Sequence, residues 1–324
     1  MDELTQKRKY VWLADTAGLK QERDKAKYDK AVNLSKEIEK IKDRMVKDMK
    51  SRDPKIARIA TACYLIYRTA MRVGDEKDPD EADTVGATTL RKEHIKVTDK
   101  AIEFDFLGKD SVRWQEKVPA VGHDEQFRDN LKKLIENKKP KDEIFHDITS
   151  RHVNAYFSSI VKGLTAKVFR TYLASTVVAK YLKEHDNIKS KSPNEKLYHA
   201  KLANLQAAIM CNHKRTIPKT FESALQKKKE TLKKAKDSVP KTEKQKEKKK
   251  ERIEKIKLQI DLAEKTKDYN IGTSLRNYID PRVFKAWTDE VGAEWEKLYT
   301  AALQKKFLWV KNEKDSWKTV SKHY

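Results

Sequence analysis

The 324-residue sequence has little cysteine and no long apolar run. Its two cysteines, Cys63 and Cys211, both lie in apolar helical patterns, which excludes a disulfide framework and favours a reducing compartment. No stretch of about 18 apolar residues could span a bilayer. The first residues, MDELTQKRKY, lack the pattern of a signal peptide. We therefore expect an intracellular protein with no membrane contact.

Metal ligands are scarce as well. Cys211 and His213 could supply two ligands, but no second pair accompanies them, whereas zinc sites use four ligands or three plus water. We expect neither a metal ion nor another cofactor.

Positive charge is what the sequence has in excess. The formal net charge is +23 and the sequence pI is near 9.6. Such an excess destabilises a compact chain by self-repulsion unless a polyanion relieves it. Nucleic acid is the commonest partner of this kind, and an anionic membrane surface is the weaker alternative. Apolar residues make up only 38%, but they are concentrated in periodic blocks, so a globular protein with a charged appendage is expected.

Most of the chain has a helical period. Apolar residues recur at steps of three and four in several stretches. The stretch that begins at 56 should end at Gly74, a residue suited to a helix C-cap. The predicted helices are 20–49, 56–74, 125–137, 150–162, 165–185, 193–212 and 281–290, with a further one at 293–312.

A period of two replaces the helical period in one region. Residues 90–97, 101–107 and 111–118 alternate or cluster β-branched and aromatic side chains, with short polar joints between them. They predict a three-stranded antiparallel meander with Lys109 at the tip of its second hairpin. A further short strand is expected at 8–13. The predicted fold class is thus mainly α with a small antiparallel sheet.

Residues 222–268 contain no aromatic side chain, and Lys and Glu are their commonest residues. Leu225 and Leu232 are seven apart, and isoleucines at 253, 256 and 260 keep steps of three and four. A break near Pro240 divides the two halves. This pattern predicts an antiparallel two-helix coiled coil that projects from the body.

Five segments carry residues suited to cutting a phosphodiester without a metal. That chemistry needs a nucleophile, cations for the phosphate oxygens, and an acid for the departing oxygen. The segments are TAMRVGDEK (69–77), FDFLGKDSVRW (104–114), LTAKVFRTY (164–172), MCNHKRTIPKTF (210–221) and GTSLRNYIDPR (272–282). In this order they resemble the active-site segments of the eukaryotic and archaeal type IB DNA topoisomerases. The resemblance runs from about residue 9 to residue 309.

The resemblance implies a catalytic fold shared with tyrosine recombinases, double-stranded DNA as the partner, and a role for each matched residue. Tyr278 is then the nucleophile that forms a 3′-phosphotyrosyl link. Arg72 and Arg170 hold the non-bridging oxygens, a task that suits a guanidinium fork, and His213 donates to the same oxygens. Lys109 is the general acid. The positions expected to touch DNA are Lys77, Thr84, Lys167 and Asn277.

The same resemblance implies a division of the chain and a missing part. The predicted segments are an N-terminal strand and helix (1–52), a catalytic core (53–221), the coiled-coil linker (222–268) and a C-terminal domain (269–324). Family members carry a further N-terminal lobe that closes over DNA, so we expect a truncated form, a subunit or a reduced relative. A monomer is expected, with the lobe possible in trans. Its location would be the nucleus in a eukaryote, or the nucleoid in an archaeon.

Two other functions remain open from the residues. A tyrosine recombinase uses a similar set, but usually has histidine three before the second arginine, where Lys167 stands here. Its nucleophile also follows the histidine closely, whereas His213 and Tyr278 are 65 residues apart (278 − 213). A non-catalytic DNA-binding protein would account for the charge alone. Taken singly, each candidate residue has an ordinary structural explanation, and only the five segments together favour catalysis.

Overall fold

The computed structural model describes residues 13–74, 85–108, 113–185 and 187–324. They form a mainly helical protein with one three-stranded antiparallel sheet, as the sequence predicted. The longer helices are α1 (Gly18–Asp48), α2 (Pro54–Thr69), α3 (His123–Ile135), α4 (Ser150–Ile160), α5 (Ala166–Lys183), α6 (Pro193–Met210), α7 (Phe221–Asp237), α8 (Glu243–Thr266) and α10 (Pro281–Val291). Within these residues, no helix has both the length and the apolar character that a bilayer crossing needs.

The sheet is a meander of β1 (Ile95–Val97), β2 (Ala101–Leu107) and β3 (Arg113–Pro119). Ile95 pairs with Phe104, and Phe106 pairs with Trp114, so that apolar side chains share one face. The first strand is shorter than expected because residues 92–94 form a 3-10 turn, η1. The predicted hairpin tip, with Lys109, lies outside the described residues. Of the strand expected at 8–13, only Leu13 is described, and it is not in a strand.

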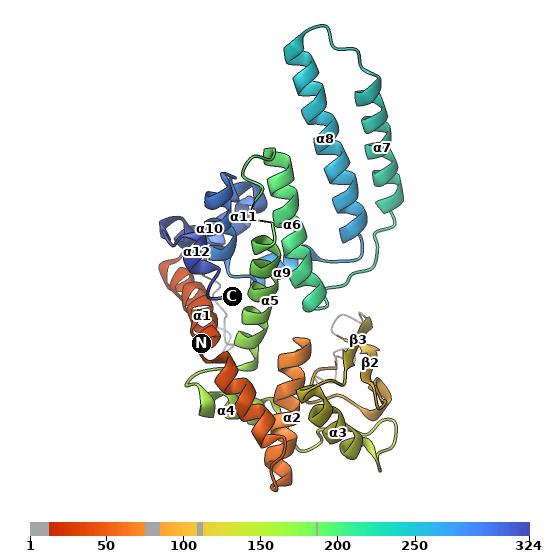
Figure 1. Cartoon of the computed structure of the whole chain (residues 1–324), viewed down its shortest axis with the longest axis vertical. Helices are drawn as coiled ribbons and strands as arrows, with labels where there is room; N and C mark the ends of the chain where they lie inside the picture. The colour runs from red at the N-terminus through yellow and green to blue at the C-terminus, as the bar shows by residue number, and fades with distance from the viewer. Residues whose placement is uncertain (1–12, 75–84, 109–112, 186) are drawn as a thin grey trace, which may run out of the picture.

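Two hydrophobic cores lie along the chain, and α5 passes from one to the other. Val168 and Phe169 belong to the core built around α1, α2 and the sheet. Ala174 and Val178 belong to the core shared with α6, α10 and the C-terminal segments. In Figure 1, α5 and α6 run through the middle, with the sheet below and the C-terminal helices to one side. Arg170 is therefore placed where the two cores meet.

The end of α2 differs from the prediction. The helix stops at Thr69 rather than near Gly74, and Ala70 takes a left-handed conformation with φ 50°. The chain then leaves the helix. The carbonyl of Arg72 accepts a hydrogen bond from the amide of Ala87, and the carbonyl of Val73 accepts one from the amide of Thr88, both at 2.8 Å. These bonds to residues fifteen positions away replace the helical ones and carry Arg72 off the helix.

The predicted two-helix hairpin is present as α7 and α8, which lie side by side and extend beyond the body (Figure 1). Leu225, Ala235 and Ile256 are its buried apolar residues. The hairpin is joined to the body by a neck of two short segments, 213–215 and 268–270. There Lys214 pairs with Tyr269, the amide of Arg215 donates to Asp268 O at 2.8 Å, and that of Asn270 donates to His213 O at 2.7 Å.

The hairpin is less detached than the sequence suggested, because the half of α8 nearer the neck lies along α6. Ser192 at the start of α6 donates to Glu254 at 2.7 Å. Further down, the hydroxyl of Tyr198 donates to Asp261 and accepts from Lys265 at 2.9 Å. The half of α8 nearer the neck is therefore held to the body through α6.

The C-terminal region contains more short pieces than expected. The helix predicted at 293–312 is divided into η3 (Trp295–Leu298), α11 (Ala301–Lys306) and η4 (Leu308–Asn312). Thr300 starts a new helix by accepting the amide of Leu303, which interrupts the pattern. A short helix, α9 (Ile271–Asn277), precedes Tyr278, and α12 (Trp317–Val320) lies near the C-terminus.

Candidate active site

Arg170 and Tyr278 are in direct contact. The Nη1 of Arg170 donates to the phenol oxygen of Tyr278 at 3.1 Å, and the guanidinium carbon lies 4.6 Å from the centre of the tyrosine ring. Arg170 is 5% exposed, and its Nη2 donates to the Cys211 carbonyl at 2.9 Å. A fixed guanidinium beside a phenol oxygen stabilises the negative charge that develops when the phenol ionises. Two predicted site residues, 108 positions apart, are thus brought together.

His213 also lies beside the same tyrosine. Its ring centre is 5.2 Å from that of Tyr278, and its Nδ1 lies 2.7 Å from the Ser274 hydroxyl. Burial, with the charges of Arg170 and Arg72, lowers the pKa of His213 to about 3, so the ring is neutral at pH 7. Its Nε2 is buried and has no partner among the described residues. A neutral imidazole with a free ring nitrogen can donate a hydrogen bond without adding charge.

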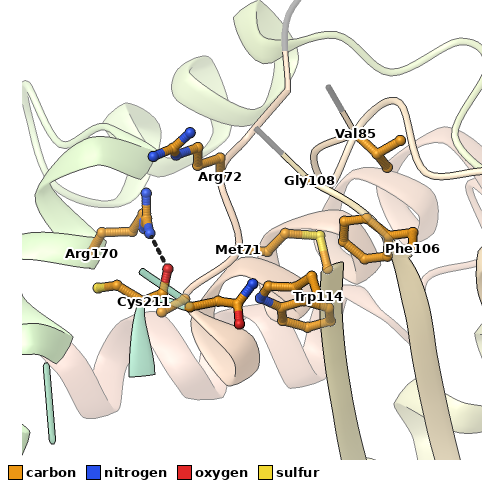
Figure 2. A pocket seen from close by; sticks show the side chains of 10 residues that line it. Met71, Arg72, Val85, Phe106, Gly108, Trp114, Arg170 and Cys211 are labelled. Carbon is orange, nitrogen blue, oxygen red and sulfur yellow. Dashed lines mark hydrogen bonds between the residues drawn. The ribbon is translucent and has the colours of Figure 1, made fainter. Parts of the chain in front are cut away.

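Arg72 completes the cluster. It is half-buried and lines a small pocket together with Arg170 and Cys211. Figure 2 shows the two guanidinium groups at one end of this pocket, while Met71, Phe106 and Trp114 form an apolar wall. Two guanidinium groups at one opening suit the oxygens of a phosphate. The apolar wall suits the face of a base or sugar.

A buried carboxylate fixes the chain directly after Tyr278. Asp280 is fully buried; its carboxylate accepts from Arg282 at 2.8 Å and from Tyr324 at 2.9 Å. The Asp280 amide donates to Ser175 of α5 at 2.9 Å. Arg282 in turn donates to Asp29 of α1 at 2.7 Å. The backbone carrying Tyr278 is therefore held to both α5 and α1.

The predicted DNA-contact residues are only partly described. Lys167 and Asn277 are exposed near the site, one turn before Arg170 and one residue before Tyr278. Lys27 of α1 donates to the Asn277 carbonyl at 3.2 Å, and burial lowers its pKa to about 8 despite nearby Asp24. Lys77, Thr84 and the predicted general acid Lys109 lie outside the described residues.

Sequence reasoning missed several polar residues of this site. Ser274, Ser175 and Asp280 are buried, and each holds a predicted site residue or its backbone. The only available signal was the Asp-Pro pair at 280–281, which is typical of a helix start. In the described part of the chain, no three His, Cys, Asp or Glu side chains gather closely enough to hold a metal ion.

Comparison with known families identifies the group to which these residues belong. A family model described as the catalytic core of eukaryotic DNA topoisomerase I matches residues 16–265, and one described as the C-terminal topoisomerase domain matches residues 250–319. The chain belongs to the eukaryotic DNA topoisomerase I family. The resemblance seen in the five segments is thereby confirmed.

Individual members of the topoisomerase I family agree with this. DNA topoisomerase 1 of Caenorhabditis elegans is 36% identical over 330 residues, which cover 93% of this chain and 40% of that protein. DNA topoisomerase 1 of Homo sapiens is also 36% identical, over 334 residues that cover 93% of this chain and 43% of the human protein. The chain thus spans about two fifths of the length of these curated relatives.

Proposed function

We propose that this chain is a type IB DNA topoisomerase that relaxes supercoiled DNA. It would cut one strand through a 3′-phosphotyrosyl intermediate, allow rotation and rejoin the strand, without metal or ATP. The observation that carries this proposal is the hydrogen bond from Arg170 to the phenol oxygen of Tyr278, beside the free Nε2 of His213. A candidate nucleophile, a cation and a neutral imidazole thereby lie side by side.

In this mechanism each residue has one task. The oxygen of Tyr278 attacks the phosphorus, its proton passes to solvent water, and the bond from phosphorus to the 5′ oxygen breaks, while Arg170 stabilises the charge that develops on the phenol oxygen. Arg72 and Arg170 bind the non-bridging oxygens, and Nε2 of His213 donates to one of them. By analogy with other preorganised donors, loss of one of these contacts should cost about 3–4 kcal/mol of transition-state stabilisation. Lys109 would give the departing 5′ oxygen its proton.

Double-stranded DNA is the proposed partner. Lys167 and Asn277 are exposed beside Tyr278 and would contact the backbone, as would Lys77 and Thr84. Most of the affinity should be electrostatic, given the net charge of +23, and should fall steeply with salt. We propose a monomer, and the division at 52, 221 and 268 remains a prediction.

The test is a suicide substrate, a nicked duplex from which cleavage releases a short 5′-hydroxyl strand. The protein is then resolved on a denaturing gel, with EDTA present throughout. A covalent adduct should form with the unaltered protein and with Tyr269→Phe, a control that removes a nearby hydroxyl outside the cluster. It should vanish in Tyr278→Phe while DNA binding is retained.

Other outcomes discriminate the alternatives. An adduct that persists in Tyr278→Phe would assign the nucleophile elsewhere, and a strict magnesium requirement would contradict the guanidinium mechanism. Salt-dependent binding without any adduct would favour a non-catalytic DNA-binding protein. Strand exchange between two specific sites would instead indicate a recombinase.

A further inference from the structure

Ser274 contacts both His213 and the backbone of Tyr278. It is fully buried on α9, and its hydroxyl lies 2.7 Å from Nδ1 of His213. Its carbonyl accepts the amide of Tyr278 at 2.9 Å and that of Ile279 at 3.2 Å. One residue therefore joins the neutral donor to the turn that carries the nucleophile.

The hydrogen-bond arrangement decides which nitrogen of His213 holds the proton. The ring is neutral, because the pKa is about 3, so one nitrogen donates and the other accepts. If Nδ1 carried the proton, it would donate to Ser274. Among the residues that the structure describes, the buried hydroxyl would then have no acceptor, and Nε2 would remain an unpaired acceptor. Two buried groups would then be unsatisfied, each at a cost of about 1–3 kcal/mol.

The opposite tautomer leaves only one group unpaired. When the Ser274 hydroxyl donates to Nδ1, the proton of His213 must sit on Nε2. That N–H is the group left without a partner among the described residues, and its ring lies 5.2 Å from that of Tyr278, beside which a phosphate under attack would offer an acceptor oxygen. The unpaired donor is thereby satisfied when DNA is bound.

We infer that Ser274 is a positioning residue that holds His213 as the Nε2–H tautomer and aligns this donor with Tyr278. The inference rests on the proposed function, because the role of the aligned donor is to bind the scissile phosphate. Ser274 itself would touch neither DNA nor the reacting atoms. It acts through His213, as an orienting partner acts on a catalytic imidazole.

The first test reads the tautomer directly and does not depend on cleavage. Nitrogen-15 spectra of the free protein at pH 7 should show His213 with a proton on Nε2 and none on Nδ1, assigned by the signals that disappear in His213→Asn. In Ser274→Ala the Nδ1 signal should shift as its hydrogen bond is lost. A wild-type ring protonated on Nδ1 would overturn the inference even if cleavage activity is established.

The second test separates action through His213 from a general structural effect. In single-turnover cleavage, Ser274→Ala should slow adduct formation by at least about 10-fold, but by less than the roughly 10²–10³-fold loss that is typical when a donor is removed outright. The affinity for DNA should be unchanged. In a His213→Ala background the same change should cost less than about 3-fold, because the orienting target is gone. Equal costs in both backgrounds would refute the positioning role.

Two further variants complete the design. Ser274→Thr keeps the hydroxyl and should retain the Nε2–H signal and most of the cleavage rate if it folds, which thermal unfolding checks. Thr288→Val removes a different buried hydroxyl, bonded to Phe284 O at 2.8 Å, and should leave cleavage unchanged. A cleavage loss in Thr288→Val matching that in Ser274→Ala would show that any buried hydroxyl has the same effect. If the unaltered protein forms no adduct, the proposed function fails while the spectra still decide the tautomer.

Discussion

Gly86→Ala should move Arg72 without touching any predicted catalytic side chain. Gly86 lies against the extended segment after α2, where a β-carbon would stand 2.4 Å from the amide nitrogen of Gly74 and 2.9 Å from the carbonyl oxygen of Arg72. These neighbours are backbone atoms, so no side-chain rotation relieves the clash. The two backbones must separate by about 1 Å to reach an ordinary contact.

The size of the effect follows from that displacement. The amide of Ala87 donates to Arg72 O, so the two segments are joined at the point where they must part. A misplacement of about 1 Å near a reacting group can cost about 10²-fold in rate. We expect Gly86→Ala to slow single-turnover cleavage of the suicide substrate by about that factor. Affinity for DNA should change far less, because we expect most of it to come from the net charge of +23 rather than from one side chain.

Gly18→Ala is the matched control, because a β-carbon at Gly18, in the first turn of α1, meets nothing within 4 Å. It should cleave at the normal rate. If Gly86→Ala cleaves within about threefold of the unaltered protein while remaining folded, the reasoning that the backbone contact positions Arg72 is wrong.

Three other predictions follow from the buried polar groups. Asp280→Ala should lower the free energy of unfolding by about 3 kcal/mol, which is the low end for breaking a buried ion pair, because Arg282 still pairs with Asp29. Urea denaturation measures this change. A loss below about 1 kcal/mol would show that Asp280 does not stabilise the fold in this way. The pKa of His213 is about 3 in the folded state and near 6.5 in the unfolded state, so the unfolded state gains the proton first as pH falls. The free energy of unfolding should therefore fall by up to about 3 kcal/mol between pH 6.5 and 4. This fall should be absent in His213→Asn. Tyr198→Phe should lower the free energy of unfolding by about 1 kcal/mol and speed amide hydrogen exchange in α8 over 254–266. Unchanged exchange over these residues would show that the contact with α6 does not stabilise this helix.

Periodicity was sufficient to predict most helices because their apolar faces are continuous. Residues 165–185 and 193–212 were predicted as helices and form α5 and α6 with small differences at the ends. The failures come from hydrogen bonds that local patterns do not encode. The helix predicted to reach Gly74 ends at Thr69, because residues 72 and 73 bond to 87 and 88 instead. The stretch 293–312 kept its apolar residues but was interrupted where Thr300 starts a new helix.

The candidate site shows the same division. Tyr278, Arg170, His213 and Arg72 were predicted from motif order; Arg170 and His213 lie beside Tyr278, and Arg72 lines a pocket with Arg170. The residues that orient them were not found, because their contacts join distant parts of the chain. Asp280, for example, is bonded to Ser175 of α5 and to Tyr324 near the C-terminus, and nothing near it in sequence indicates those partners.

The neck of the helical hairpin has an evolutionary consequence. Because 213–215 and 268–270 are bonded to each other, the distance across the neck is fixed whatever lies beyond it. Insertions or deletions of whole turns in the distal half could accumulate among descendants without disturbing either end. Lineages should therefore differ most in hairpin length and least in the six residues of the neck.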